Sequence, residues 1–242
     1  MKSTIKLGIP HLNYNGLDCV WFFKELAHKH WMLLGEAKNM RENAQRLYAS
    51  IYAAEVEFAG DQSQVEEDDV IEISHRLYRI ANHVFRSVHI LSKAGETFAT
   101  FTLDSIFLKK SADKKLVRAE NIERLEVGEP LHDIDVLDQH KQVKRALRGQ
   151  AFDNLLHLPF SPAEYFNCIK VLYFANYLHL VSLCEFLSFD CVMPPIKRLT
   201  IYYFGNMQIT DKMYGRSLQH GEHTTTTLVV NDLPVCLAKI AR

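Results

Sequence analysis

The chain has 242 residues and carries 28 Lys and Arg against 29 Asp and Glu, so its formal net charge is −1 with neutral histidines. Hydrophobic residues make up 48% and charged residues 24%, which excludes a disordered or collagen-like chain. The near-zero charge removes the electrostatic case for binding to nucleic acid or to a membrane surface. A chain of this length buries roughly 70–75% of its unfolded surface, enough for one large domain or two small ones.

The cysteines are scattered and form no C-x-x-C pair: Cys19, Cys168, Cys184, Cys191 and Cys236. This pattern predicts reduced thiols in a cytoplasmic protein, with neither a disulfide framework nor a zinc cluster. Segment 1–16 has no apolar core of signal-peptide length. The most apolar stretch, 171–187, is short for a membrane span and is interrupted by polar residues. We therefore predict a buried helix there and no membrane partner.

In the first half, an irregular segment over 1–16 is followed by a helix and several strands. The apolar spacing over 17–34 suits a helix that is buried on most of its surface, with Asn15 or Asp18 as its cap. From 46 onward, β-forming residues predict a strand in which alternate residues from Tyr48 to Val56 share one face. Further strands are predicted at 70–80, 84–91 and 96–108, with a turn at Gly95 between the last two.

Residues 109–155 are highly charged and predict a solvated connector with room for one surface helix. The second half then repeats the order of the first. A turn at 159–162 leads into a helix over 164–187, and strands follow at 197–206, 224–230 and 235–240. The sequence thus predicts a first lobe over 1–108 and a second lobe over 156–242.

Turn, buried helix and antiparallel strands occur twice in the same order, without a repeat at the residue level. A helix wrapped by a curved antiparallel sheet is the hot-dog unit. The predicted fold class is therefore α+β, a double hot dog with a site in the seam between its lobes.

Five segments carry distinctive motifs. GLDCVWFFKELAHKHW at 16–31 has the pattern GL-x3-W-x2-KE-x4-HW, and RLYAS at 46–50, FNCIKVLYFANY at 166–177, IYYFGN at 201–206 and the closing segment 223–242 follow it. The first motif resembles the opening helix, and the closing segment the last strands, of a small family from polyketide-pathway clusters, the leinamycin-pathway bifunctional acyltransferase/decarboxylase family. The three segments between them also match this family. The resemblance therefore spans nearly the whole chain.

The resemblance implies a double hot-dog fold and chemistry on acyl thioesters. The family's founding enzyme takes an alkylmalonyl group from coenzyme A, decarboxylates it and delivers the shortened acyl group to an acyl carrier protein. Its proposed nucleophile is the tyrosine of the LYA motif, which is Tyr48 here. The implied substrate is a malonyl-type (methylmalonyl) coenzyme A thioester, and the implied partner is a carrier protein with its phosphopantetheine.

Three positions depart from the family's pattern. Cys168 and Lys170 stand where glycines are expected, and Thr200 stands where an acidic residue is expected just before the YFGN strand. These changes fall near the presumed seam, and they leave the substrate and the decarboxylation step open.

Decarboxylation of a malonyl-type thioester requires no metal and no organic cofactor, because the thioester carbonyl is itself the electron sink. The site must donate hydrogen bonds to the thioester oxygen as enolate charge develops. Asn15, Gly16 and Leu17 are candidate binding residues, since a helix start offers free N–H groups and a favourable dipole. The alternative is an ordinary capped helix start.

Tyr48 has two possible roles. As a nucleophile it must be a phenolate, so a cation or several hydrogen bonds would have to lower its pKa from about 10. As a neutral donor it polarises the thioester carbonyl. The structural alternative is a tyrosine packed on a strand face, and Tyr52 is its rival. Tyr203 and Asn206 have opposite parity in a regular strand, and we expect Asn206 to contact the substrate.

Two other functions stay open. A hot-dog thioesterase or dehydratase-like enzyme would use Asp18 or Glu25 as its base, although Lys29 is an i,i+4 partner for Glu25. The other is a non-catalytic module that binds carrier proteins. In each case an acidic carrier protein would contact basic residues, and the candidates are Lys109, Lys110, Lys114, Lys115, Arg118 and the run 141–148.

The histidines predict no metal site. His30, beside a tryptophan on the first helix, is expected to be a satisfied core histidine. His220 and His223 are three residues apart, have no third ligand in sequence and flank a glycine turn.

Overall fold

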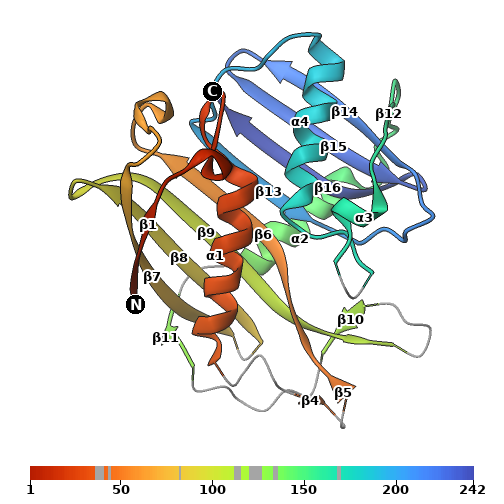
Figure 1. Cartoon of the computed structure of the whole chain (residues 1–242). Helices are drawn as coiled ribbons and strands as arrows, with labels where there is room; N and C mark the ends of the chain where they lie inside the picture. The colour runs from red at the N-terminus through yellow and green to blue at the C-terminus, as the bar shows by residue number, and fades with distance from the viewer. Residues whose placement is uncertain are drawn as a thin grey trace.

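The computed structural model describes residues 1–35, 41–42, 45–81, 83–111, 116–119, 127–132, 136–167 and 170–242. Its main feature is one long sheet with the strand order β1-β7-β8-β9-β6-β13-β16-β15-β14-β12, antiparallel throughout this path. At its centre β6 pairs with β13 and joins the two halves of the chain. The helices α1 (Cys19–Leu33) and α4 (Asn176–Phe189) lie across one face of the sheet, one on each half (Figure 1).

The first half contributes β1 (Lys2–Lys6), β6 (Tyr48–Phe58), β7 (Val70–Ala81), β8 (Val84–Lys93) and β9 (Glu96–Lys110). The second half contributes β12 (Leu156–Leu158), β13 (Arg198–Tyr203), β14 (Met213–His220), β15 (His223–Val230) and β16 (Leu233–Ala241). Shorter elements are η1 (Ile9–His11), β2 (Leu12–Asn13), β3 (Gly16–Leu17), β4 (Arg41–Glu42), β5 (Gln45–Arg46), η3 (Gln62–Gln64), β10 (Leu116–Arg118), β11 (Glu129–Pro130), α2 (Val136–Leu147) and α3 (Pro162–Tyr165).

The first predicted helix is confirmed as α1, and its start is set by Asp18. The Asp18 carboxylate accepts hydrogen bonds from the backbone N–H groups of Val20 and Trp21 at 2.8 and 3.1 Å. These bonds satisfy two of the donors that a helix start leaves free. On its buried face Phe23 packs edge-on against Phe101 of β9, with ring centres 5.2 Å apart.

The second long helix is shorter than the predicted 164–187. It divides into α3 and α4, and α4 begins only at Asn176. Lys170 adopts a left-handed φ of +62°, which a continuous helix excludes. The chain folds back so that the N–H of Tyr173 donates to the Tyr165 carbonyl at 3.0 Å. The Asn176 amide secures this turn by donating to two carbonyls of α3.

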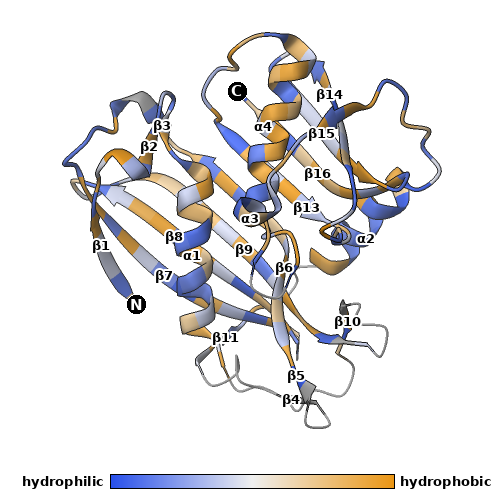
Figure 2. Cartoon of the chain, turned by 45° about the vertical axis from the view of Figure 1, so that its right-hand side comes forward, coloured by the Kyte–Doolittle hydropathy of each residue, from blue (hydrophilic) through white to orange (hydrophobic). Residues whose placement is uncertain are grey.

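After that turn, α4 is hydrophobic along most of its length (Figure 2). Seven of its residues are buried, and it packs on β12, β14 and β15 of the second half. One buried hydrophobic cluster runs from Phe101 in the first lobe to Leu228 in the second. The two lobes therefore share a continuous core.

Besides short pairings of two or three residues, two longer strands lie where none was predicted. Segment 1–16, predicted to be irregular, contains β1, which pairs with β7 at the edge of the sheet. β14 was also missed, and it pairs with β15 in a hairpin. The remaining predicted strands are confirmed with small shifts of their ends, as β6, β7, β8, β9, β13, β15 and β16.

A β-bulge in β6 changes which side chains share a face. The register against β9 shifts between Ile51 and Ala53. Ile51 and Ala54 pack in the cluster beneath the helices, whereas Tyr52 and Ala53 pack in a cluster on the outer face. The prediction that alternate residues from 48 to 56 share one face is therefore wrong, because side chains of equal parity before and after the bulge point to opposite sides.

The outer face of the sheet carries α2, the helix expected in the connector, with its first and last residues buried. His140 Nε2 donates to the Tyr203 carbonyl at 2.8 Å, and Lys144 Nζ donates to the Phe204 carbonyl at 2.9 Å. Both acceptors lie at or just after the end of β13. α2 therefore holds this end of the central strand from the outer side.

Candidate functional site

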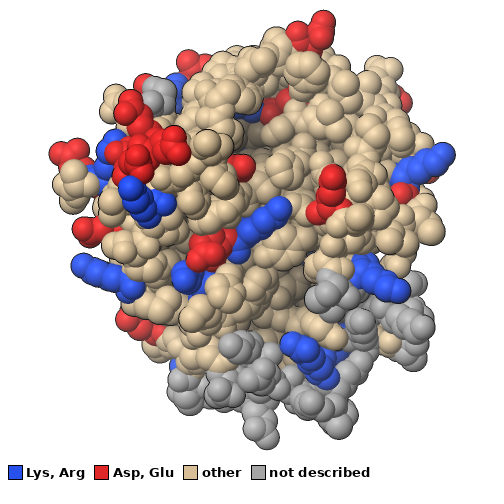
Figure 3. Space-filling view, viewed as in Figure 1, with Lys and Arg blue, Asp and Glu red and all other residues tan. Residues whose placement is uncertain are grey.

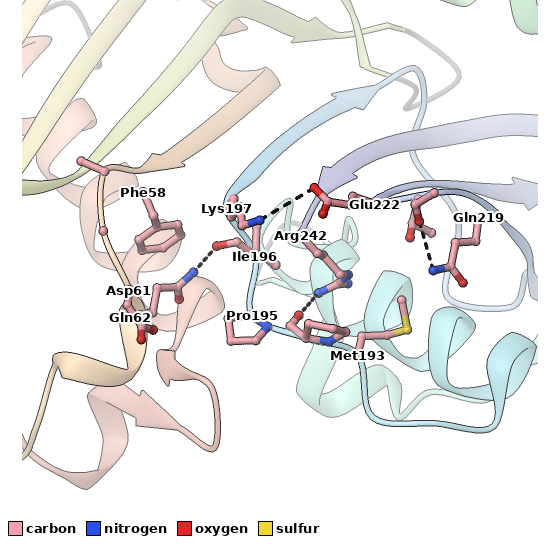
Figure 4. Close-up of a pocket in the computed structure, with 15 residues that line it drawn as sticks. Phe58, Asp61, Gln62, Met193, Pro195, Ile196, Lys197, Gln219, Glu222 and Arg242 are labelled. Atoms are coloured by element: carbon pink, nitrogen blue, oxygen red, sulfur yellow. Dashed lines mark hydrogen bonds and ion pairs between the residues drawn. The ribbon is translucent and has the colours of Figure 1, made fainter.

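A cavity of about 680 Å³ opens at one end of the seam between the lobes. Its wall is formed by the end of β6 with loop 59–62, the segment 193–197 between α4 and β13, the β14–β15 hairpin, and Arg242 (Figure 4). The cavity's size, and a wall that combines apolar side chains with a few polar groups, are typical of a small-molecule site. The apolar part of the wall is Phe58, Ala59, Met193, Pro194, Pro195 and Ile196.

A buried ion pair anchors the Arg242 side of the cavity. Arg242 Nη2 donates to Glu185 Oε2 of α4 at 2.6 Å, and Nη1 donates to the Pro194 carbonyl. The two side chains are only 9% and 3% exposed. Burial raises the pKa of the Glu185 carboxyl, and the Arg242 cation opposes that rise. In the described part of the chain, Glu185 Oε1 and Arg242 Nε have no hydrogen-bond partner.

The turn before α1 contacts cavity-wall residues from both halves of the chain. The Gln62 side chain is buried, and its Nε2 donates to the Ile196 carbonyl across the seam. Gly16, with a φ of +110°, packs directly on the backbone of Gln62. Asn15 Nδ2 donates to the Met193 carbonyl at 3.3 Å. Two of the predicted binding residues thus position wall residues of the cavity.

The start of α1 offers few free donors. Leu17 is 1% exposed and belongs to the hydrophobic core. The N–H groups of Val20 and Trp21 are bound by the Asp18 carboxylate, and that of Phe22 donates to the Asp18 carbonyl at 3.0 Å. The N–H groups of the first turn of α1 are therefore already bound by Asp18, which is also one of the two bases considered for a thioesterase.

Glu25 and His30 of α1, and the two histidines of the β14–β15 hairpin, have the surroundings that the sequence predicts. Glu25 forms an ion pair with Lys29 at 3.2 Å. His30 is fully buried and hydrogen-bonded through both ring nitrogens. His220 and His223 face each other across the exposed β14–β15 hairpin. Among the residues that the structure describes, no group of three or more His, Cys, Asp or Glu is placed to bind a metal ion.

Tyr48 lies at the end of β6 opposite the cavity. Phe58, the last residue of β6, lines the cavity. At about 3.3 Å per residue, the strand places Tyr48 roughly 30 Å from it. The ring is partly exposed, it pairs across the sheet with Leu108, and the Arg46 guanidinium carbon lies 5.7 Å from the ring centre. A single bound thioester group cannot contact both Tyr48 and the cavity.

In the IYYFGN segment, Tyr203 points inward and Asn206 is exposed. Tyr203 is buried, with its ring centre 5.3 Å from that of Tyr177. Because β13 runs antiparallel to β6, Asn206 lies toward the Tyr48 end of the seam. The sequence-predicted residues thus fall into two groups at opposite ends of β6. The turn before α1 lies at the cavity end, and Tyr48 and Asn206 lie at the other.

Aromatic side chains fill the seam at the start of α4. Phe174 packs edge-on against Tyr203 at 6.0 Å, and the Tyr177 hydroxyl donates to the Gly205 carbonyl at 3.2 Å. Burial raises the pKa of Tyr173 in this cluster to about 12. The two lobes therefore differ at their helix starts, since the start of α1 lies behind the cavity wall and the start of α4 is packed with rings.

Tyr52, the rival of Tyr48, lies beneath α2 on the outer face. It is 6% exposed, and its hydroxyl has no hydrogen-bond partner among the described residues. Nearby, Arg86 binds the buried Asp104 carboxylate through two 2.7 Å bonds. Burial raises the pKa of Tyr52, and the negative charge of Asp104 raises it further. Tyr52 is therefore a neutral phenol that faces away from the seam.

The positions that depart from the family pattern lie away from the cavity wall as far as the structure describes them. Lys170 is exposed in the turn before α4. Thr200 lies on β13 and faces the outer side, because its neighbours Leu199 and Ile201 face the core. Cys168 lies outside the described residues.

Charge is spread thinly over the face that carries α1 and α4. Figure 3 shows this face with uncharged residues over most of its area and charged residues between them. The basic run 141–148, which was predicted to contact a carrier protein, lies almost entirely on α2. It is therefore on the outer side of the sheet, away from this face. The side chain of Lys110 and residues 112–115, which include Lys114 and Lys115, lie outside the described part of the chain.

Sequence reasoning missed Gln62, Arg242 and the segment 193–197. The Pro194–Pro195 pair is a local signal for an extended, rigid backbone. No local pattern marks Gln62 or Arg242, because their position at the seam depends on segments far apart in the chain.

Among solved structures, the chain is similar to a 12:0-ACP thioesterase from Umbellularia californica, with a TM-score of 0.71 at 10% identity, covering 100% of this chain and 96% of that one. An acyl-ACP thioesterase from Bacteroides thetaiotaomicron gives a TM-score of 0.67 at 8% identity, with coverages of 100% and 96%. HtdX of Mycobacterium tuberculosis gives 0.56 at 10% identity over 99% of each chain.

No family model matches the chain, and no curated protein matches it. The structural similarities confirm the predicted fold class, α+β with a double hot-dog architecture. Within the described residues, no helix is both long and apolar enough to cross a membrane.

Proposed function

We propose that the protein is an enzyme that acts on acyl thioesters carried by coenzyme A and by an acyl carrier protein. The observation that supports this most is the cavity of about 680 Å³ at the seam of a double hot dog. An apolar wall with a few polar groups at its rim suits the arm and acyl chain of a pantetheine thioester. Two proteins that share the fold over the full chain are thioesterases for acyl-carrier-protein substrates.

The reaction that we propose is decarboxylative acyl transfer in polyketide biosynthesis, as the family resemblance implies. The carbon–carbon bond to the carboxylate breaks, its electron pair passes into the thioester carbonyl, and carbon dioxide leaves. The resulting enolate takes up one proton on carbon. The shortened acyl group then moves to the carrier thiol, directly or through Tyr48, and coenzyme A leaves as its thiol with the proton that the carrier thiol gives up. An apolar wall such as Phe58, Pro195 and Ile196 would favour the loss of neutral carbon dioxide over retention of the carboxylate.

Tyr48 stays in this proposal as the residue that is acylated or that polarises the thioester when the thioester binds at its end of the seam instead of in the cavity, with Asn206 as a substrate contact at the same end. Asn15, Gly16 and Leu17 would act at the other end by shaping the cavity wall. Because roughly 30 Å of strand separates Tyr48 from the cavity, substitutions at the two places test two distinct locations for the thioester.

Thioester hydrolysis is the second candidate. It is favoured by the shared fold with two acyl-ACP thioesterases and by the buried Glu185 carboxylate of α4, which is bound to Arg242 at the cavity. The bases considered from sequence are less suited. Asp18 caps α1, and Glu25 is paired with Lys29.

Intact mass spectrometry separates the alternatives. The protein is incubated with methylmalonyl-coenzyme A and a carrier protein bearing phosphopantetheine. A propionyl mass gain on the carrier is the result that we expect. Free acid without a loaded carrier would favour hydrolysis. Retained carrier binding without turnover would indicate a non-catalytic module and overturn the enzyme proposal.

Two variants with a matched control locate the thioester. Ala59→Phe narrows the cavity, Tyr48→Phe removes the phenol at the other end of β6, and Tyr14→Phe makes the same chemical change at a residue that is 77% exposed. We expect the control to load the carrier at the wild-type rate. Loading that survives Tyr48→Phe but not Ala59→Phe places the thioester in the cavity, and the reverse pattern places it at Tyr48.

A further inference from the structure

Six polar side chains form an unbroken hydrogen-bonded chain inside the first lobe. Every contact in it is 2.7 or 2.8 Å long. His30, His89 and Ser87 are fully buried, and Ser3 at the edge of the sheet is the partly exposed end. The members lie on β1, β7, β8, α1 and β9, in the order Ser3–His75–His89–Ser87–His30–Ser105.

These hydrogen-bonded side chains attach α1 to the sheet. His30 binds Ser87 of β8 through Nδ1 and Ser105 of β9 through Nε2. The surrounding core beneath α1 is otherwise mostly apolar. Because buried polar groups in such surroundings are costly when unpaired, the attachment depends on every link being made.

The hydrogen-bonding capacity of each side chain sets how many extra protons the hydrogen-bonded chain can take up without losing a link. A neutral imidazole has one N–H donor and one acceptor, and a hydroxyl can donate and accept. With three neutral histidines, each link therefore holds one proton. One extra proton on any of the three keeps every link, because the donors then point outward from the charged ring. A second extra proton keeps every link only if His30 is one of the two charged rings and Ser87 accepts from both His30 and His89. The Ser87 O–H then has no acceptor within the hydrogen-bonded chain. A third extra proton sets the Nδ1–H groups of His75 and His89 against each other, so full protonation breaks the chain.

The surroundings also oppose protonation. Burial lowers the pKa of His30 to about 3 and that of His75 to about 4, and it places the pKa of His89 well below its usual value. The charged groups facing His75 are Lys29 and the N-terminal ammonium, which lower its pKa further, and Glu25, which raises it. His89 faces the two other histidines.

We propose that this chain of three histidines and three serines is an acid-sensitive latch that holds α1 on the sheet of the first lobe. The latch is closed while the histidines are neutral, and it is released when they take up protons. Because the turn before α1 packs on Gln62 and Met193 of the cavity wall, release of α1 also opens one wall of the cavity. The inference does not depend on the reaction proposed above.

Proton linkage gives the direction in which the stability of the latch changes with pH. Exposed histidines in the unfolded chain bind protons with a pKa of about 6.5, whereas burial lowers the pKa of all three latch histidines in the folded lobe. The latch therefore contributes its full stability above about pH 6.5. The contribution falls as the pH drops from there toward about 4. With two or three protons taken up on release, the unfolding equilibrium constant rises roughly 100- to 1000-fold per pH unit once the unfolded histidines are charged.

The test uses the full chain, with urea unfolding followed by tryptophan fluorescence between pH 7.5 and 4.5. Both tryptophans, Trp21 and Trp31, lie on α1, so the signal reports directly on the latched helix. His30→Gln keeps a donor and an acceptor but cannot take up a proton. We expect its unfolding constant to change about tenfold less per pH unit than that of the wild type. His220→Gln, on the exposed hairpin, should match the wild type. Equal pH slopes in His30→Gln and the wild type would overturn the proposal.

A second measurement needs no variant. Ring nitrogen chemical shifts of the wild type, read together with amide hydrogen exchange in α1, follow protonation and release as the pH falls. We expect the three latch histidines to stay neutral until the amides of α1 lose protection. Ordinary titration of all three near pH 6.5, with α1 still protected, would also overturn the latch.

Discussion

Replacing Gly16 with alanine should be far more damaging than its position next to an exposed turn indicates. Gly16 has a φ of +110°, and an added Cβ would lie 2.7 Å from the carbonyl carbon of Gln62 and closer still to its oxygen. Backbone atoms cannot rotate away as a flexible side chain does. The Gly16→Ala variant must therefore displace the loop that carries Gln62, and with it the bond from Gln62 to Ile196 across the seam.

The expected loss of unfolding free energy in Gly16→Ala has two parts, backbone strain and steric overlap, and a matched variant separates them. A left-handed backbone costs an L-residue roughly 1–2 kcal/mol. Forcing a methyl group into a filled space adds about 1–3 kcal/mol. Gly95, in the β8–β9 turn, has a φ of +86° and no atom within 4 Å of an added Cβ. We therefore expect Gly95→Ala to lose about 1–2 kcal/mol of unfolding free energy and Gly16→Ala to lose about 2–5 kcal/mol.

Urea unfolding at pH 7.5 measures both variants against the wild type. The excess loss in Gly16→Ala should be accompanied by weaker binding of a coenzyme A thioester, because the displaced residue lines the cavity. Equal losses in the two alanine variants would show that the close approach to Gln62 is absent in solution, and the described wall of the cavity would then be wrong.

Other predictions concern buried charge, the helix cap and the thiols. Arg86→Met should cost about 3–5 kcal/mol by urea unfolding, because it leaves the Asp104 carboxylate buried without its cation, and the double variant with Asp104→Leu should regain most of that loss. Asp18→Asn should keep the α1 cap and change the thermal midpoint little, so a selective loss of turnover would assign a chemical role to the Asp18 charge. Burial raises the pKa of Cys19 to about 12, so iodoacetamide at pH 8 should alkylate exposed Cys191 long before Cys19, and comparable rates monitored by mass spectrometry would refute the buried position of Cys19.

Local patterns were sufficient for most of the elements. The helix over 17–34 was predictable because its apolar spacing and the capping aspartate act within a few residues of each other. The long strands of the first half and the Gly95 turn were predictable for the same reason. The repeated order of helix and strands then pointed to two hot-dog lobes, which the similarity in fold confirms.

Tertiary packing decided the features that no local pattern encodes. The bulge after Ile51 turned Tyr52 to the outer face, and the left-handed Lys170 lies in the turn that divides the predicted helix into α3 and α4. The cavity brings together Gln62 and Arg242 from distant parts of the chain. The periodicity of hydrophobic residues along the sequence indicates which side chains are buried. Where a space remains unfilled, and which buried groups meet across it, depends on how segments far apart in sequence are positioned against each other.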